Sequence, residues 1–198
     1  MVDLSTKYLG LKLRNPIIAA SSGLTDSIKS IQELEKNGAA AIVLKSIFEE
    51  EITHEYEALI READHLGYHA EHMDYFDYQI REKNINHYTQ LIKDAKASVD
   101  IPIIASINCF STHEWEYFAQ NCENYGADAL ELNIFVSPSN NELGSDSTEK
   151  RYFEIIKKVQ GKVKIPISLK ISPYFSNLSL SHFKALACPL ITVCAGEL

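Results

Sequence analysis

The chain has 198 residues, of which 45% are hydrophobic, and it carries a formal net charge of -8 with a pI near 5.4. This length can bury a single sizeable core, so we expect one domain over residues 1-198. The acidic balance lacks the basic footprint that nucleic acid or an anionic membrane surface requires. Small metabolites or protein partners are the classes that remain.

The absence of recognisable targeting signals and the spacing of the cysteines point to the cytoplasm. No stretch approaches the roughly 20 apolar residues of a membrane span, and the first residues lack the order of a signal peptide. The cysteines show no C-x-x-C spacing, so neither a zinc knot nor a redox pair is indicated; they are Cys109, Cys122, Cys188 and Cys194. We therefore expect a cytoplasmic protein with reduced thiols.

The N-terminal part predicts a hairpin, a buried strand and a helix. Residues Leu4 to Leu13 alternate around Gly10, which is typical of a small hairpin or an opening strand. Ile17 to Ala20 follow a proline and form an apolar run that predicts a buried strand. Ser27 to Lys36 have helical spacing, with Asp26 or Ser27 as the cap.

The chain then repeats itself in two ways. Residues 37-46 and 125-134 share one plan, in which a helix end is followed by Gly-Ala, an apolar strand and a polar residue. Residues 99-108 and 163-172 share another, in which Ile-Pro introduces a strand. Each segment therefore predicts a buried strand.

Helical segments separate these strands. They are Ile85 to Ala97, Thr112 to Tyr125, and Ser147 to Val159, while Leu190 to Val193 is a sixth strand candidate after five earlier ones. Alternating strands and helices predict right-handed βαβ units and a parallel sheet. The internal echoes favour an α/β fold of the (β/α)8 TIM-barrel type, incomplete, with the N-terminal five to six strands of the barrel.

Polar side chains follow several of the predicted strands. In a barrel of this type the residues that carry chemistry collect at the C-terminal strand ends; here these are Ser21, Ser22, Lys45, Ser46, Asn108, Asn133, Lys170 and Ser172. A lysine at the end of an apolar strand needs an anion or an electron-rich ligand to stay charged. Alternatively, each lysine reaches solvent or pairs with a carboxylate such as Glu131.

The two asparagines and the glutamate have structural alternatives of their own. Asn108 and Asn133 could cap the following helices, a common role for Asn at a strand-helix junction. Glu131 alternates with Leu130 and Leu132, so it is a candidate for a counter-charge inside the barrel. Two lysines and two asparagines at matching strand ends nevertheless favour a ligand pocket.

The strand-end motifs together resemble those of the dihydroorotate dehydrogenases. The matching segments are Asn15 to Gly23, Leu44 to Ser46, Ala105 to Asn108, Glu131 to Asn133 with Ser137-Pro138, and Leu169 to Phe175. Their order and spacing are similar to the class 1 enzymes, which are cytosolic FMN-containing (β/α)8 barrels. The resemblance covers residues 1-177 and leaves 178-198 as an atypical C-terminal tail.

The resemblance implies roles for individual residues. Ala20, Ser21 and Gly23 would lie against the flavin ring, with Lys45, Ser46 and Asn108 binding the flavin or the substrate beside it. Lys170 would approach the flavin N1/O2 edge, and Asn133 would hold the pyrimidine. The implied reaction removes the C5 proton of dihydroorotate and passes a hydride from C6 to flavin N5, giving orotate for pyrimidine biosynthesis.

The sequence departs from the family where the catalytic base is expected. Class 1 enzymes have a cysteine before the proline of this loop, whereas this chain has Ser137 after an additional residue. Class 2 enzymes use serine there, so Ser137 is the candidate base beside Lys45; alternatively, Ser137-Pro138 is only a turn. Ser139 stands where the family has a substrate-binding asparagine after the proline, and Asn140 or Asn141 is near enough to replace it.

The segment from Phe48 to Lys83 lacks the family's substrate loop and is acidic and aromatic instead. His65 and His69 have i, i+4 spacing, but no H-E-x-x-H motif is present, so we expect no metal site. A lid over the strand ends or a partner-facing helix is favoured, anchored by Ala58 to Ile60 and Tyr75 to Ile80.

The C-terminal part leads us to expect a truncated or divergent family member. The family's last strands carry the Gly-rich loops that bind the FMN phosphate, and those loops do not occur in this sequence. We therefore weigh a dihydroorotate dehydrogenase-like oxidoreductase against a non-catalytic half-barrel that binds a protein, and against a related flavin-dependent pyrimidine reductase. A homodimer is a candidate assembly.

Overall fold

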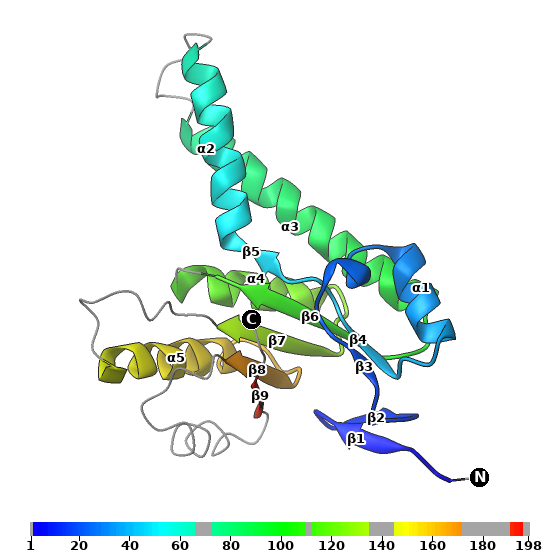
Figure 1. Cartoon of the computed structure of the whole chain (residues 1–198). Helices are drawn as coiled ribbons and strands as arrows, with labels where there is room; N and C mark the ends of the chain where they lie inside the picture. The colour runs from blue at the N-terminus through cyan, green and yellow to red at the C-terminus, as the bar shows by residue number, and fades with distance from the viewer. Residues whose placement is uncertain (1, 66–72, 110–111, 135–144, 172–190, 196–198) are drawn as a thin grey trace.

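The computed structural model describes the chain except residues 1, 66-72, 110-111, 135-144, 172-190 and 196-198 (Figure 1). Within this part, strands and helices alternate. They are β1 (Thr6–Tyr8), β2 (Leu11–Leu13), β3 (Ile18–Ala19), the 3-10 helix η1 (Gly23–Thr25), α1 (Ile28–Lys36), β4 (Ala41–Val43), β5 (Ile47–Phe48), α2 (Glu49–His65), α3 (Met73–Ser98), β6 (Ile103–Asn108), α4 (Thr112–Asn124), β7 (Ala129–Ile134), α5 (Ser145–Gln160), β8 (Ile167–Ile171) and β9 (Ile191–Ala195).

The strands form a parallel sheet in the order β3-β4-β6-β7-β8-β9, with the short strand β5 also paired to β6. Because neighbouring strands in this order are also successive along the chain, the sheet is the beginning of a TIM barrel. The predicted incomplete barrel is thus confirmed, including the sixth strand near Leu190. The sequence analysis did not foresee β5, which follows β4 after a short bend.

The two faces of the sheet have different partners. Ile103, Ala105 and Ile107 of β6 belong to the large core cluster that includes the buried faces of the helices. Ile104, between them, belongs to a smaller cluster with Leu13 of the hairpin β1-β2. Since side chains alternate along a strand, one face of the sheet packs on the helices and the other faces the barrel interior.

Helices α1, α4 and α5 begin and end close to their predicted bounds, whereas α3 begins at Met73, well before the predicted Ile85. Ser27 caps α1, and its side-chain oxygen accepts a hydrogen bond from the backbone N–H of Ser30. Gly38 and Gly126 follow the ends of α1 and α4 with φ angles of 104° and 95°, in the region that favours glycine. The N–H groups at and after each glycine bond back to carbonyls in the last helical turn, which ends each helix in the same way.

A second repeated feature is a hydrogen bond from the segment before a strand to a glutamate near the end of a helix. The side chain of Glu35 accepts the backbone N–H of Asp100 at 2.9 Å, just before Ile101. Glu123 occupies the equivalent place before Gly126 and accepts the N–H of Lys164 at 2.7 Å. The internal echo therefore extends to side chains that position both Ile-Pro segments.

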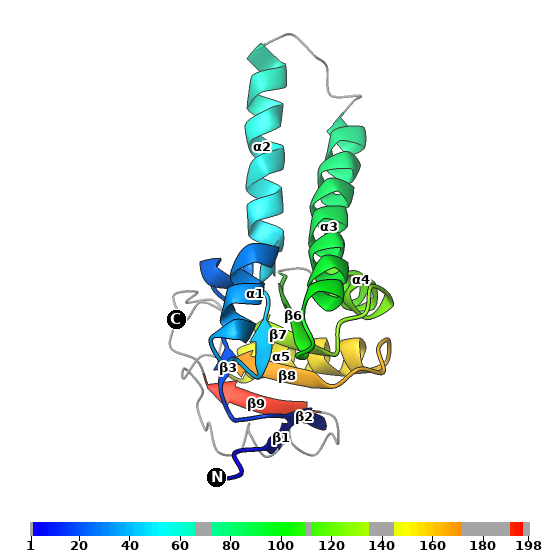
Figure 2. The same cartoon turned by 90° about the vertical axis from the view of Figure 1, so that its right-hand side faces the viewer.

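Helices α2 and α3 form a long antiparallel pair that extends beyond the sheet (Figures 1 and 2). Glu55 of α2 joins the pair, because its carboxylate accepts hydrogen bonds from Lys83 and Asn84 of α3, each at 2.9 Å. The segment for which the sequence predicts a lid or a partner-facing helix is thus a helical pair, and both roles stay predictions. Of the expected anchors, Ala58 is exposed and Ile80 is buried, while the side chains of residues 59-60 and 75-78 lie outside the described part.

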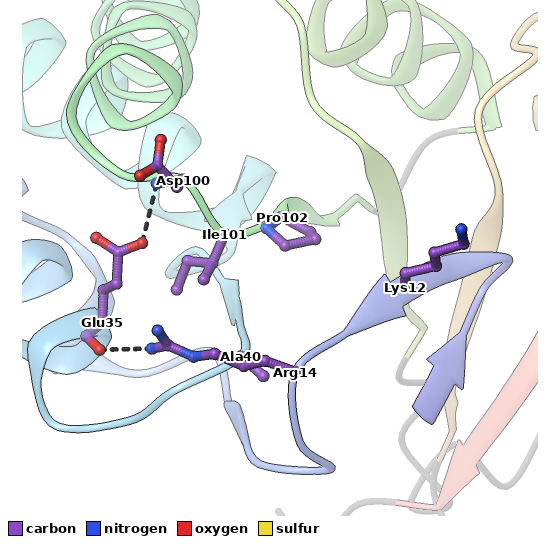
Figure 3. Close-up of a pocket in the computed structure, with 7 residues that line it drawn as sticks. All are labelled: Lys12, Arg14, Glu35, Ala40, Asp100, Ile101 and Pro102. Atoms are coloured by element: carbon purple, nitrogen blue, oxygen red, sulfur yellow. Dashed lines mark hydrogen bonds between the residues drawn. The ribbon is translucent and has the colours of Figure 1, made fainter. Parts of the chain in front are cut away.

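A depression of about 390 Å³ lies at the opposite end of the sheet from the strand-end residues (Figure 3). Its lining residues are Lys12, Arg14, Glu35, Ala40, Asp100, Ile101 and Pro102. The Arg14 guanidinium donates to the carbonyls of Glu35 at 2.6 Å and Ala39 at 2.5 Å, which satisfies the C-terminal end of α1. These contacts stabilise the base of the fold.

Candidate functional site

Polar side chains form two rows across the interior face, near the C-terminal ends of the strands. Ser106 of β6, Glu131 of β7 and Ser168 of β8 lie opposite one another in register. One step further along, Asn133 of β7 lies opposite Lys170 of β8. All of these are buried except Lys170, which is partly exposed. The interior is therefore apolar at the base and polar towards the strand ends.

A β-bulge separates β4 from β5 and contains Lys45. Val43 pairs with Ile104 and Ile47 pairs with Ile107, so one extra residue lies on the β4 side. The backbone N–H of Lys45 donates to the carbonyl of Thr25 at 3.2 Å instead of to β6. Bulges turn side chains away from the regular pleat, and this one directs the backbone of Lys45 towards the segment after β3.

The phenol of Tyr88 contacts β6 beside this bulge. Tyr88 is a buried residue of α3, and its hydroxyl accepts the backbone N–H of Ser106 at 2.8 Å and donates to the carbonyl of the same residue at 2.9 Å. The side chain thus supplies hydrogen bonds where the bulge interrupts the regular ladder between β4 and β6. Burial raises the pKa of this phenol well above its ordinary value, so it stays protonated.

Four side chains form a continuous hydrogen-bonded chain from the strand ends to the interior. The hydroxyls of Ser21 and Ser46 lie 3.2 Å apart, and those of Ser46 and Ser106 lie 2.7 Å apart. The Ser106 hydroxyl donates to Oε1 of Glu131 at 2.9 Å. Ser46 and Ser106 are buried, whereas Ser21 is partly exposed. We refer to Ser21, Ser46, Ser106 and Glu131 as the hydroxyl chain.

Glu131 is the buried acid of this site. Its side chain is 8% exposed, and burial raises the pKa of its carboxyl group. The hydrogen bond from Ser106 and the positive charge of Lys170 act in the opposite direction, because both favour the carboxylate. The interior position expected from the strand alternation agrees with this placement.

The other predicted site residues lie around the same end of the sheet. Lys45 is 43% exposed at its side chain, with its Nζ 3.9 Å from Oε1 of Glu51. Ala20 and Gly23 are exposed beside Ser21, and Asn108 ends β6 with a partly exposed side chain.

Neither predicted asparagine directly precedes a helix. Asn133 lies inside β7, and Asn108 is separated from the first residue of α4, Thr112. The capping alternative therefore does not describe their positions. Ser137 and Asn140 lie outside the described residues, so their roles stay predictions.

The described part of the chain contains two buried thiols, Cys109 and Cys122. No group of three or more His, Cys, Asp or Glu that could hold a metal ion occurs there. Burial raises the pKa of Cys122 to about 12 and that of Cys109 further still, so neither thiol ionises near neutral pH. In the same part of the chain, none of the helices has the length and apolarity needed to cross a membrane.

The sequence analysis missed the contributions of Ser106 and Tyr88. Ile104, Ser106 and Asn108 alternate along β6 and therefore lie on one face of the strand. The increase in polarity along this series was a signal for polar residues in the barrel interior. Tyr88 carried no such signal, because an aromatic residue in an amphipathic helix is indistinguishable from an ordinary core residue.

Comparison with known proteins identifies the family. The family model described as "Dihydroorotate dehydrogenase" matches residues 3–193. The chain belongs to the dihydroorotate dehydrogenase family. The resemblance carried by the strand-end motifs is thereby confirmed.

Similar proteins include enzymes that are named for two different activities. The chain is 32% identical over 186 residues to "Dihydroorotate dehydrogenase B (NAD(+)), catalytic subunit" of Thermoplasma volcanium, covering 90% of this chain and 57% of the relative. It is 25% identical over 186 residues to "NAD-dependent dihydropyrimidine dehydrogenase subunit PreA" of Escherichia coli K12, covering 89% of this chain and 43% of the relative. The chain spans about half the length of these curated relatives.

Two solved structures with a similar fold are both named dihydrodipicolinate synthase. Dihydrodipicolinate synthase from Bacillus clausii aligns with a TM-score of 0.54 at 10% identity, covering 91% of this chain and 54% of that chain. The Agrobacterium tumefaciens enzyme of the same name aligns with a TM-score of 0.53 at 16% identity, covering 91% and 52%. At these identities the likeness shows the fold alone.

Proposed function

We propose that this chain provides part of the flavin and substrate site of a dihydroorotate dehydrogenase-like oxidoreductase that acts in pyrimidine biosynthesis in the cytoplasm. One observation carries the proposal: Asn133 and Lys170 lie opposite each other in adjacent strands, above the buried carboxyl group of Glu131. An amide and an ammonium group side by side match the carbonyl and N–H edges of a flavin or a pyrimidine. Family membership supports the same assignment.

The donor set at the strand ends fits FMN. Lys45 and Lys170 are partly exposed cations that can bind electron-rich carbonyl edges, while Asn108 and Asn133 present amides that both donate and accept. Around Gly23 the space is open, since an added Cβ would meet nothing within 4 Å. A planar ring system could therefore approach the backbone there. When bound, FMN would supply the hydride acceptor for oxidation of the substrate.

The residues of this chain would bind and orient the reactants. The Lys170 ammonium group would stabilise negative charge that develops on a neighbouring ring, because a preorganised cation needs no reorganisation during reaction. Asn133, held in β7, would fix the orientation of a pyrimidine amide or carboxylate. Ser137, with Lys45 as the second catalytic residue, would take the proton from C5 of dihydroorotate, while Asn140 would bind the substrate.

Flavin binding and reduction test the proposal directly. The purified chain is mixed with FMN and separated from the excess, and the visible spectrum should show a retained flavin band. Anaerobic addition of dihydroorotate should bleach that band, and Lys170→Ala should slow bleaching by about a hundredfold. Lys158→Ala is the matched control, because Lys158 is an exposed residue of α5. A colourless protein, or an unchanged rate in Lys170→Ala, would contradict the proposal.

The Escherichia coli relative favours a second candidate substrate. Because this relative is named as a dihydropyrimidine dehydrogenase subunit, we also propose a related flavin-dependent activity on pyrimidine bases. Dihydrouracil added in place of dihydroorotate separates the two. Bleaching by dihydrouracil but not by dihydroorotate would select the second candidate.

A further inference from the structure

We propose that Glu131 acts through the hydroxyl chain on Ser21, which faces the ligand. The charge of Glu131 decides whether the Ser21 hydroxyl accepts a hydrogen bond from the ligand or donates one to it. The inference rests on the proposed function for the identity of the ligand. The chain itself is given by the contacts from Ser21 to Ser46, Ser106 and Glu131. Glu131 and Ser106 are thereby positioning residues that act on the ligand through Ser21.

The direction of the chain follows from the charge of its buried end. Ionised Glu131 can only accept, so the Ser106 proton points to it. The Ser106 oxygen then accepts from Ser46, and the Ser46 oxygen accepts from Ser21. Ser21 has used its proton in this state, and its remaining lone pair offers a ligand only a hydrogen-bond acceptor.

Protonation of Glu131 allows the opposite direction. The carboxyl proton donates to Ser106, Ser106 donates to Ser46, and Ser46 donates to Ser21. The Ser21 oxygen also accepts the backbone N–H of Ser46 at 2.9 Å, so both of its lone pairs are occupied. Its own proton is then free to be donated to a ligand carbonyl or carboxylate. The two states differ by one proton exchanged with solvent at Glu131.

The surroundings of Glu131 make both states accessible. Burial favours the neutral acid, whereas Lys170 on β8 and the Ser106 hydroxyl favour the carboxylate. Tyr88 on α3 also faces this charge, but its phenol is held by the backbone of Ser106 and stays protonated. Glu131 is therefore the member of the hydroxyl chain whose charge can change.

Titration of Glu131 in the ligand-free chain tests the coupling. Selective 13C labelling of glutamate side chains gives carboxyl signals by NMR, and Glu131→Gln assigns the signal. We expect Ser106→Ala to raise the apparent pKa of Glu131 most and the more distant Ser46→Ala to raise it less. Thr89→Val should leave it unchanged, because the buried hydroxyl of Thr89 donates to the carbonyls of Ile85 and Asn86 within α3.

A second variant keeps this test decisive. Should Ser46→Ala fail to fold, Ser21→Ala removes the partly exposed end of the chain and should also raise the pKa of Glu131. If the variant that folds, Ser46→Ala or Ser21→Ala, leaves the titration of Glu131 unchanged, the proposed coupling is wrong. Because no flavin is needed, this result is independent of the proposed function.

The ligand-facing part of the inference is tested by FMN affinity. The dissociation constant of FMN for the parent chain should change by about threefold or more across the titration of Glu131, the size of one hydrogen bond. Ser46→Ala should lose that change, and Thr89→Val should keep it. Identical pH profiles for parent and Ser46→Ala would overturn the inference. Absence of FMN binding in every variant would instead refute the proposed function and, with it, any role of Ser21 toward FMN.

Discussion

The hydroxyl of Tyr88 bonds to both backbone polar groups of Ser106, at 2.8 Å to the nitrogen and 2.9 Å to the oxygen. A helix side chain thus completes a sheet strand at the point where the β-bulge containing Lys45 interrupts regular pairing. This contact connects the outer helical layer with the interior polar row, because Ser106 also belongs to the hydroxyl chain.

Tyr88→Phe should therefore destabilise the protein. The substitution keeps the ring but removes hydrogen bonds to buried backbone groups, which costs about 1–3 kcal/mol. Urea denaturation followed by circular dichroism measures the loss. Tyr117→Phe serves as the control, since the side chain of Tyr117 is 46% exposed and should lose little. Equal midpoints for the two variants would mean that the Tyr88 hydroxyl does not support β6.

The raised pKa of Glu131 predicts a pH-dependent stability. Its folded-state pKa exceeds the ordinary value of 4.5, so between the two values the folded chain binds more protons than the unfolded chain. The stability that Glu131 contributes is present below about pH 4.5 and declines as the pH rises through the folded-state value. The stability of the parent relative to Glu131→Gln, from urea midpoints, should fall over this window. A stability difference between parent and Glu131→Gln that rises with pH would contradict the prediction.

Glu55 should behave in the opposite way. Hydrogen bonds from Asn84 and then Lys83 lower its pKa below 4.5, so its contribution is present above that value and is lost as the pH falls through the folded-state pKa. Glu55→Gln should narrow the stability difference between pH 7 and acid conditions, measured by the same urea midpoints. Glu50→Gln, at an exposed residue of α2, is the control. Parallel pH profiles of stability for parent and Glu55→Gln would argue against a stabilising role for the hydrogen bonds that join Glu55 of α2 to Lys83 and Asn84 of α3.

The glycines at the two repeated helix ends should resist substitution. Gly38→Ala and Gly126→Ala each place a side chain in a left-handed backbone conformation, at a cost of about 1–2 kcal/mol. Gly161→Ala is the control, because an added Cβ there meets only ordinary contacts from 3.5 Å. Thermal denaturation should show lower midpoints for the first two variants than for the third. A similar loss in all three would indicate that backbone conformation is not the cause.

The ion pair of Lys45 should contribute little to stability. Its Nζ lies 3.9 Å from Glu51, and the two side chains are 43% and 62% exposed, so solvent screens the interaction. Glu51→Gln should change the urea midpoint no more than the exposed control Glu50→Gln. A clear loss specific to Glu51→Gln would favour the alternative in which Lys45 serves a structural ion pair.

The fold could be predicted from the sequence because its elements are signalled locally. The apolar runs after Gly38 and Gly126 have strand length, and the stripes of α1 and α5 have helical period, so these elements follow from their own residues, whereas β5 was not predicted. The repeated Gly-Ala and Ile-Pro segments then indicated parallel strands built by repetition. Even Glu131 could be placed inside the barrel, since alternation in a strand needs no knowledge of the neighbours.

The connections among site residues depend on contacts that the sequence does not encode locally. Ser46 meets Ser106 only because a bulge shifts one strand by a residue against its neighbour, and Tyr88 reaches the same strand from a helix. Such contacts join residues 60 and 18 positions apart. Their geometry depends on strand register and helix packing, so the hydroxyl chain emerged only when the sheet was assembled.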